Sequence, residues 1–124
     1  MIQMAAVVYF AMIVGVVAFQ VCLIAGAPWG RLTQGGGHAG ALPARGRVAA
    51  GVSILLLLAM AAGVASAAGL PPGWPAWTGW TALGIQAVST VLNWITPSPA
   101  ERRLWGPVTT AMLALAALVV IGLR

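Results

Sequence analysis

Four long apolar stretches divide the chain, and prolines, glycines or arginines separate them. Each stretch approaches the roughly 20 apolar residues that cross a bilayer as an α-helix. We therefore predict an all-α fold, a polytopic membrane protein in which four transmembrane helices form a compact antiparallel bundle. The predicted spans are residues 4–25, 48–68, 76–96 and 105–123, and the whole chain forms a single domain.

The connecting segments contain residues that end or begin helices. Two prolines and seven glycines in the first loop, residues 26–47, argue against regular structure there. The second loop, residues 70–75, is a short uncharged turn. In the third, Ser98, Pro99 and Glu101 predict a capping box with proline at the first helical position, so the last helix begins ahead of its apolar span.

The second span is rich in small residues at a spacing of four. Such ridges allow the backbone of another helix to approach closely. The alternative is that they only reflect the abundance of alanine in a biased genome. The two ridges are Ala59, Gly63 and Ala67, and Ala61, Ala65 and Gly69.

Composition supports the membrane interpretation. Hydrophobic residues make up 61% of the chain and charged residues 6%, against about 25% charged residues in a typical soluble domain. A chain of 124 residues has too high a surface-to-volume ratio to bury so much apolar surface by itself. The only cysteine, Cys22, lies inside an apolar span and is expected to be an inert buried thiol.

The arginines predict the topology. The first and third loops contain five of the six arginines, and the second loop contains none. The positive-inside rule then places the first and third loops in the cytoplasm and both termini outside, in a bacterial inner membrane. Because these arginines flank apolar spans, we expect them to contact anionic lipid headgroups or a protein partner, and not nucleic acid. They are Arg31, Arg45, Arg47, Arg102 and Arg103.

Polar residues within the spans form a candidate cluster. Four of them share one helical face of the third span, and the other spans contribute four more, all in the predicted cytoplasmic half. Polar groups are costly in hydrocarbon, so they should point into the bundle. They form either interhelical hydrogen bonds or a small polar cavity, open to the cytoplasm, for a headgroup, a quinone or a small solute. The cluster is Gln20, Ser53, Gln86, Ser89, Thr90, Asn93, Thr109 and Thr110.

The inventory of reactive side chains is small. His38 is the only histidine and Glu101 the only acid. One chain therefore has no usual set of three or four metal ligands, no carboxylate pair and no aspartate for a catalytic triad. Residues 35–40 match G-x-G-x-x-G, but no predicted strand precedes them, so a flexible turn is expected. We predict no metal, no cofactor and no enzymatic activity.

Several short motifs resemble a group of small uncharacterised bacterial four-helix integral membrane proteins. The resemblance covers nearly the whole chain and implies the same four-helix architecture, but no activity. The motifs are Ala27-Pro28-Trp29-Gly30, Gly35-Gly36-Gly37-His38, Leu42-Pro43 with Arg45 and Arg47, Ser98-Pro99-Ala100-Glu101-Arg102 and Trp105-Gly106-Pro107.

Two functions follow from these observations. The first expectation is a non-enzymatic accessory or structural subunit of a membrane complex, packed against other membrane chains or further copies of itself through small-residue faces. The alternative is a transport or binding protein for a small solute or lipid, which uses the polar cluster. An enzyme acting on a lipid or quinone is the least favoured because acids and bases are missing.

Overall fold

A computed structural model describes residues 1–122, and all regular elements in this part of the chain are helices, with no strand. The predicted all-α class is therefore confirmed. The four long helices are α1 (Ile2–Ile24), α2 (Ala44–Ala67), α3 (Ala76–Ile95) and α4 (Pro99–Val120). Two short 3-10 turns, η1 (Gly30–Leu32) and η2 (Gln34–Gly36), lie between α1 and α2. Leu123, the last residue of the fourth predicted span, and Arg124, the sixth arginine in the comparison of the loops, lie outside the described residues.

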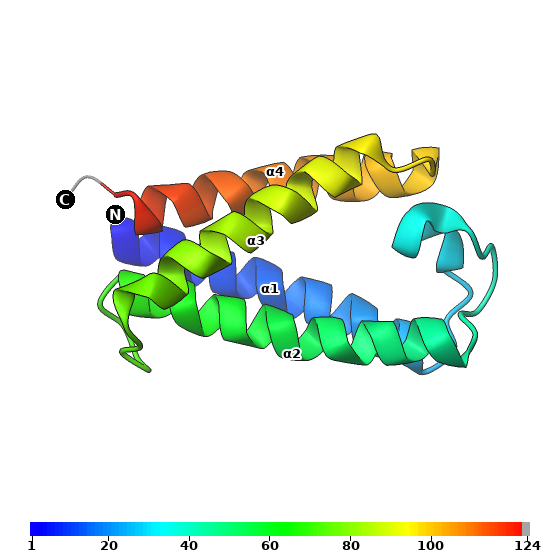
Figure 1. Ribbon diagram of the computed structural model, residues 1–124, viewed down its shortest axis with the longest axis horizontal. Helices are drawn as coiled ribbons and strands as arrows, with labels where there is room; N and C mark the ends of the chain where they lie inside the picture. The colour runs from blue at the N-terminus through cyan, green and yellow to red at the C-terminus, as the bar shows by residue number, and fades with distance from the viewer. Residues whose placement is uncertain (123–124) are drawn as a thin grey trace.

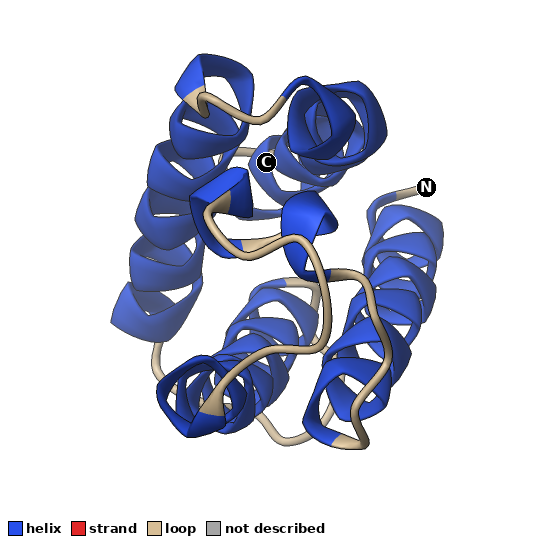
Figure 2. Cartoon of the chain, turned by 90° about the vertical axis from the view of Figure 1, so that its right-hand side faces the viewer, coloured by secondary structure: helices blue, strands red, loops and turns tan. Residues whose placement is uncertain are grey.

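Successive helices run in opposite directions and form a four-membered ring (Figure 1). α1 packs against α2 and α4, and α3 packs against α2 and α4. The start of α1 and the end of α4 lie at one end of the bundle (Figure 1). At the other end, the segment with η1 and η2 crosses in front of the space between the helices (Figure 2).

Within residues 1–122, the helices α1, α2 and α4 are each long and apolar enough to cross a membrane. The predicted third span also forms a helix with nearly the predicted bounds, but α3 is not among these three. Its polar residues, Gln86 and Asn93 above all, lower its hydropathy. Large apolar side chains are exposed on every helix, as at Val14, Leu55 and Val91. A water-soluble surface rarely carries so much exposed apolar area.

The well-packed core lies in the half of the bundle that contains both ends of the described chain. Tyr9 and Ile13 of α1 are fully buried there, together with Val64 of α2 and Met112 and Val119 of α4. A much smaller cluster of Leu23, Leu42 and Ala50 lies toward the opposite end. The middle of that opposite half is not filled by a comparable core.

Helices α2 and α3 approach most closely at two glycines. A Cβ atom added at Gly63 would lie 2.8 Å from the carbonyl oxygen of Thr78, and one added at Gly79 would lie 3.0 Å from the Cβ of Ala67. The small-residue ridge thus packs against another helix, as predicted, but that helix belongs to the same chain. Ala59 of the same ridge is exposed.

The other predicted ridge is divided. Ala61 is buried in the core, whereas Gly69 lies beyond the end of α2 with a φ of +82°. The helical part of this ridge therefore ends before Gly69, because α2 ends at Ala67.

The start of α4 confirms half of the predicted capping box. Ser98 is the N-cap, its Oγ accepts a hydrogen bond from the Glu101 N–H at 3.2 Å, and Pro99 follows it in the first turn. The predicted reciprocal bond, from the Ser98 N–H to the Glu101 carboxylate, is wrong, because this N–H donates to the Thr96 hydroxyl at 3.3 Å. The Glu101 carboxylate is thereby free to contact the segment between α1 and α2.

The first loop is shorter than predicted. Helix α2 begins at Ala44, so Arg45 and Arg47 lie on its first turns and not in the loop. Pro43 occupies the N-cap position, where its missing N–H is not needed by the helix. The expectation of no regular element was also wrong in part, since the loop contains the single turns η1 and η2.

Candidate functional site

A cavity of about 650 Å³ occupies the less densely packed half of the bundle. This volume is within the roughly 300–1,000 Å³ typical of small-molecule sites. All four helices contribute to its wall, and Thr33, Gln34 and Gly35 contribute from the segment between α1 and α2. We refer to this cavity as the pocket.

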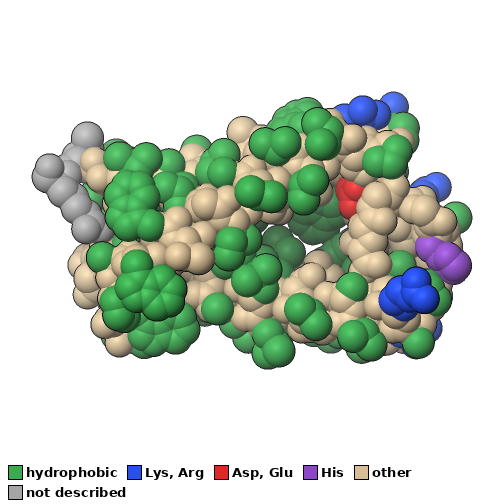
Figure 3. Space-filling model, viewed as in Figure 1, with side chains coloured by type: hydrophobic (Ala, Val, Ile, Leu, Met, Phe, Trp, Pro, Cys, Tyr) green, Lys and Arg blue, Asp and Glu red, His purple; other side chains and the backbone are tan. Residues whose placement is uncertain are grey.

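The pocket exists because α2 and α3 diverge. They pack closely at Gly63 and Gly79 and then separate along their length (Figure 1). Figure 3 shows the resulting hollow between them on the side of the molecule. Leu56 of α2 and Leu92 of α3 line the pocket and are 44% and 57% exposed, so the pocket reaches the surface between these two helices.

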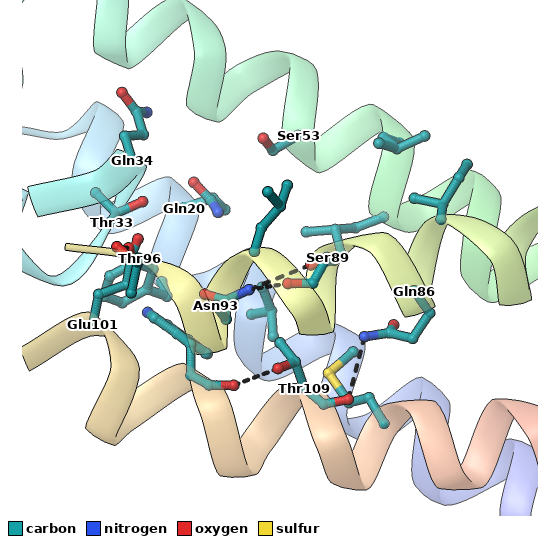
Figure 4. Close-up of a pocket in the computed structure, with 18 of the residues that line it drawn as sticks. Gln20, Thr33, Gln34, Ser53, Gln86, Ser89, Asn93, Thr96, Glu101 and Thr109 are labelled. Atoms are coloured by element: carbon teal, nitrogen blue, oxygen red, sulfur yellow. Dashed lines mark hydrogen bonds between the residues drawn. The ribbon is translucent and has the colours of Figure 1, made fainter. Parts of the chain in front are cut away.

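Six of the eight residues in the predicted polar cluster line this pocket. They come from all four helices, so the structure brings together side chains up to 89 positions apart in the sequence. The six are Gln20, Ser53, Gln86, Ser89, Asn93 and Thr109 (Figure 4).

The other two members lie outside the pocket. Thr90 is buried beside it and donates to the carbonyl oxygens of Gln86 at 2.8 Å and Thr109 at 3.1 Å. Thr110 is exposed on α4, and its hydroxyl accepts a hydrogen bond from the indole of Trp94 at 2.8 Å. Thr110 therefore belongs to the outer surface of the bundle.

Gln86 connects three helices at the inner end of the pocket. Its Oε1 accepts a hydrogen bond from the Tyr9 hydroxyl at 2.8 Å, and its Nε2 donates to the Thr109 carbonyl oxygen at 3.5 Å. This part of the cluster is interhelical hydrogen bonding, one of the two predicted alternatives. Tyr9 was not among the predicted site residues, although a lone tyrosine within an apolar helix usually needs a polar partner when it is buried.

The outer part of the cluster is less fully bonded. Ser53 Oγ donates to the Ala49 carbonyl oxygen at 3.0 Å, within its own helix, and Asn93 Nδ2 donates to the Ser89 carbonyl oxygen at 2.7 Å. Gln20 Oε1 is buried and has no hydrogen-bond donor among the described residues. These side chains therefore retain acceptor atoms that the protein does not use, as the second predicted alternative, a binding cavity, requires.

The segment with η1 and η2 covers the end of the pocket and is fixed to α4. Ser98 Oγ donates to the Arg31 carbonyl oxygen at 2.6 Å, and the Trp105 indole donates to the Leu32 carbonyl oxygen at 2.7 Å. Gly36 has a φ of +71°, and a Cβ there would lie 2.4 Å from that of Ser98. We call residues 30–36 the cover segment.

The sequence did not predict this cover because it depends on contacts between distant loops. The glycines could be identified in the sequence, but the distant residues that they contact could not.

Glu101 lies where the cover segment, α3 and α4 meet. Its carboxylate accepts hydrogen bonds from the Thr96 hydroxyl and from the Gly35 N–H, the latter at 3.4 Å. The side chain is only 7% exposed and lines the pocket. Within residues 1–122, Glu101 has no ion-pair partner. A capping role had been expected for it, and its position in the pocket wall was not predicted.

The five arginines singled out in the sequence gather at this same end of the molecule (Figure 3). Arg31, Arg45, Arg47 and Arg103 are exposed, and Arg102 is half-buried. None of the five lines the pocket. Their surface is thus separate from the pocket wall, and we call this end the arginine end.

No known family model, curated protein or solved structure matches this chain. Fold and site together define an all-helical protein with three helices able to cross a membrane and a side-opening pocket among residues 1–122. Within the same residues, no group of three or more histidine, cysteine, aspartate or glutamate side chains is placed to hold a metal ion.

Proposed function

We propose that this chain is a four-span integral membrane protein that binds a small amphiphile, either a lipid or an apolar solute with a polar end, in its pocket. The arginine end faces the cytoplasm and both termini face outward. The protein acts by binding or passing on its ligand and performs no chemistry on it.

The observation that carries this proposal is the side opening of the pocket between α2 and α3. With the helices across a bilayer, this opening faces the lipid and not the aqueous phase. Leu56 and Leu92 at its edges offer apolar surface to an acyl chain, while Asn93 and Gln20 lie deeper and offer polar atoms. A wall of mixed polarity suits a molecule with one apolar and one polar end.

Inclusion of α3 as the fourth span is supported by its position in the ring. Its polar residues Gln86 and Thr90 are buried against α1 and α4, whereas Val88 and Val91 are exposed. A helix with its polar face satisfied inside the bundle can span a membrane at lower hydropathy than an isolated one.

Filling the pocket tests the proposal. Ser53 lines the pocket, and its neighbour Val52 is 61% exposed on the same helix. We expect Ser53→Trp to lose amphiphiles that co-purify in mild detergent, because the indole occupies their space, while Val52→Trp keeps them. Native mass spectrometry of the intact protein measures the bound mass. Equal bound mass in both variants and the unmodified chain would contradict a ligand site in the pocket.

A second proposal, a subunit role, is supported by the outer face of α1. Ala11, Gly15 and Ala18 are exposed, and nothing lies within 4 Å of a Cβ added at Gly15. Small residues at this spacing permit close approach of a partner helix. We expect Gly15→Leu to release a partner membrane chain that co-purifies with the unmodified protein, whereas Ala59→Leu on α2 retains it. Purification in gentle detergent with mass determination distinguishes the two proposals.

A further inference from the structure

Several hydrogen-bond donors on the pocket wall are used within the protein. The Ser53 hydroxyl and the Asn93 amide donate to carbonyl oxygens of their own helices, at 3.0 and 2.7 Å. The Thr109 hydroxyl donates to the Trp105 carbonyl oxygen at 2.6 Å, and Gln34 Nε2 donates to the Gly46 carbonyl oxygen at 2.8 Å. These four donors are therefore not available to a ligand.

Acceptors, in contrast, remain. Gln20 Oε1 is buried without a donor among the described residues. The Glu101 carboxylate accepts two hydrogen bonds, one of them at 3.4 Å, although two carboxylate oxygens offer about four acceptor sites. Glu101 is also the only charged side chain in the pocket wall. A buried carboxylate without a positive partner is costly, so a cationic ligand would relieve that cost.

These acceptors cluster at one end of the pocket. Figure 4 shows Gln20, Thr96 and Glu101 on the side covered by the cover segment, and Gln86 far from them. Leu57, Met60, Ile85 and Met112 provide apolar surface around the Gln86 end. The pocket thus has a polar, negatively charged end and an apolar end.

Two aromatic rings flank the polar end. Phe19 and Trp105 both line the pocket, and their rings meet edge to face with centroids 4.8 Å apart. Aromatic faces attract cations, most strongly when water is excluded. Trp105 lies one helical turn after Glu101 on α4, so a cation near the carboxylate would also lie near the indole.

We infer that the pocket binds an amphiphile whose polar end is a protonated amine, with Glu101 and Gln20 accepting its hydrogen bonds and the apolar end of the pocket enclosing its hydrocarbon part. This inference rests on the proposed function. Carboxylate and phosphate headgroups are disfavoured because no arginine lines the pocket.

A series of octyl compounds tests the inference with the full chain in phosphatidylcholine nanodiscs at neutral pH. Octylamine, octanol and octanoate share one tail and differ in the polar end. Calorimetric titration, corrected with empty nanodiscs, should give an octylamine affinity at least about tenfold above that of octanol, since a charge-assisted hydrogen bond is worth more than a neutral one. Octanoate should bind weakest.

Two variants locate the preference. In Glu101→Gln, octylamine should lose its advantage and bind no more tightly than octanol. Gln20→Leu removes the other acceptor without altering the first turn of α4 and should weaken octylamine several-fold. Arg103→Gln, an exposed residue at the same end, is the matched control and should behave as the unmodified protein.

The outcomes distinguish the proposed binding function from the inference that the ligand is an amine. If the octyl compounds bind but octylamine has no advantage, or keeps it in both pocket variants, the amine inference is overturned while a binding pocket stands. If none of the three binds, the proposed function and the inference both fail. Phosphatidylethanolamine added to the nanodiscs distinguishes the sources of the amine. Competition with octylamine indicates an aminolipid headgroup, and its absence indicates a free amine.

Discussion

Tyr9 shows how one polar group within an apolar helix fixes the interior of the bundle. Its hydroxyl donates to Gln86 Oε1 at 2.8 Å, and both side chains are buried. The face that contains Gln86 could be predicted from the spacing of polar residues on one helix. Its partner could not, because tertiary pairing across 77 positions is not a periodic signal.

Removing the Tyr9 hydroxyl should destabilise the protein. In Tyr9→Phe, Gln86 Oε1 is left buried without a donor, which costs about 1–3 kcal/mol. Thermal unfolding in detergent measures the loss. The double variant Tyr9→Phe with Gln86→Leu removes both partners and should recover part of the stability. If Tyr9→Phe unfolds at the same temperature as the unmodified chain, this hydrogen bond contributes nothing to stability.

At the scale of elements, the helix bounds were the most predictable feature. Proline and the N-cap serine placed the start of α4 correctly, because local chemistry decides helix ends. The cover segment was not predictable, since its geometry depends on Ser98 and Trp105, more than 60 positions away. The pocket was foreseen only as one of two alternatives, because the divergence of α2 and α3 is a property of packing.

The crossing of α2 and α3 should be sensitive to one methyl group. In Gly63→Ala, the new Cβ would lie 2.8 Å from the Thr78 carbonyl oxygen, so the helices must separate. We expect a loss of about 1–3 kcal/mol in unfolding free energy. Gly84→Ala is the matched control, because a Cβ there meets nothing within 4 Å and alanine favours helix by about 1 kcal/mol. Equal losses in both variants would argue against close packing at Gly63.

The cover segment should detach when Gly36 is replaced. In Gly36→Ala, a positive φ and the contact with Ser98 both oppose the added Cβ. The left-handed conformation alone costs about 1–2 kcal/mol, so amide hydrogen exchange of residues 30–36 should accelerate roughly 5- to 30-fold. Gly37 has a φ of −70°, and a Cβ there would meet nothing within 4 Å. In Gly37→Ala, the amides of residues 30–36 should therefore exchange at the rate of the unmodified protein. Unchanged exchange in Gly36→Ala would mean that the cover is not fixed by this contact.

At the scale of the whole molecule, the proposed topology predicts opposite accessibility of the two ends. On a Cys22→Ser background, Ala76→Cys at the start of α3 should react with a membrane-impermeant maleimide in cells whose outer membrane alone has been permeabilised. His38→Cys, exposed at the arginine end, should react only after the inner membrane is permeabilised. The reverse pattern of labelling would show that the protein has the opposite orientation in the membrane, and it would leave the proposed pocket unaffected.

Because the pocket opens between α2 and α3, the protein responds to the concentration of ligand in the bilayer and not to its concentration in water. A ligand that arrives through the hydrocarbon is already enriched there, by about 0.8 kcal/mol for each methylene group that leaves water. Apparent affinity referred to the aqueous phase should therefore rise along a homologous series of amines even after the tail outgrows the cavity. The bilayer then serves as a reservoir, and the pocket selects by polar end among molecules that the lipid has already selected by tail.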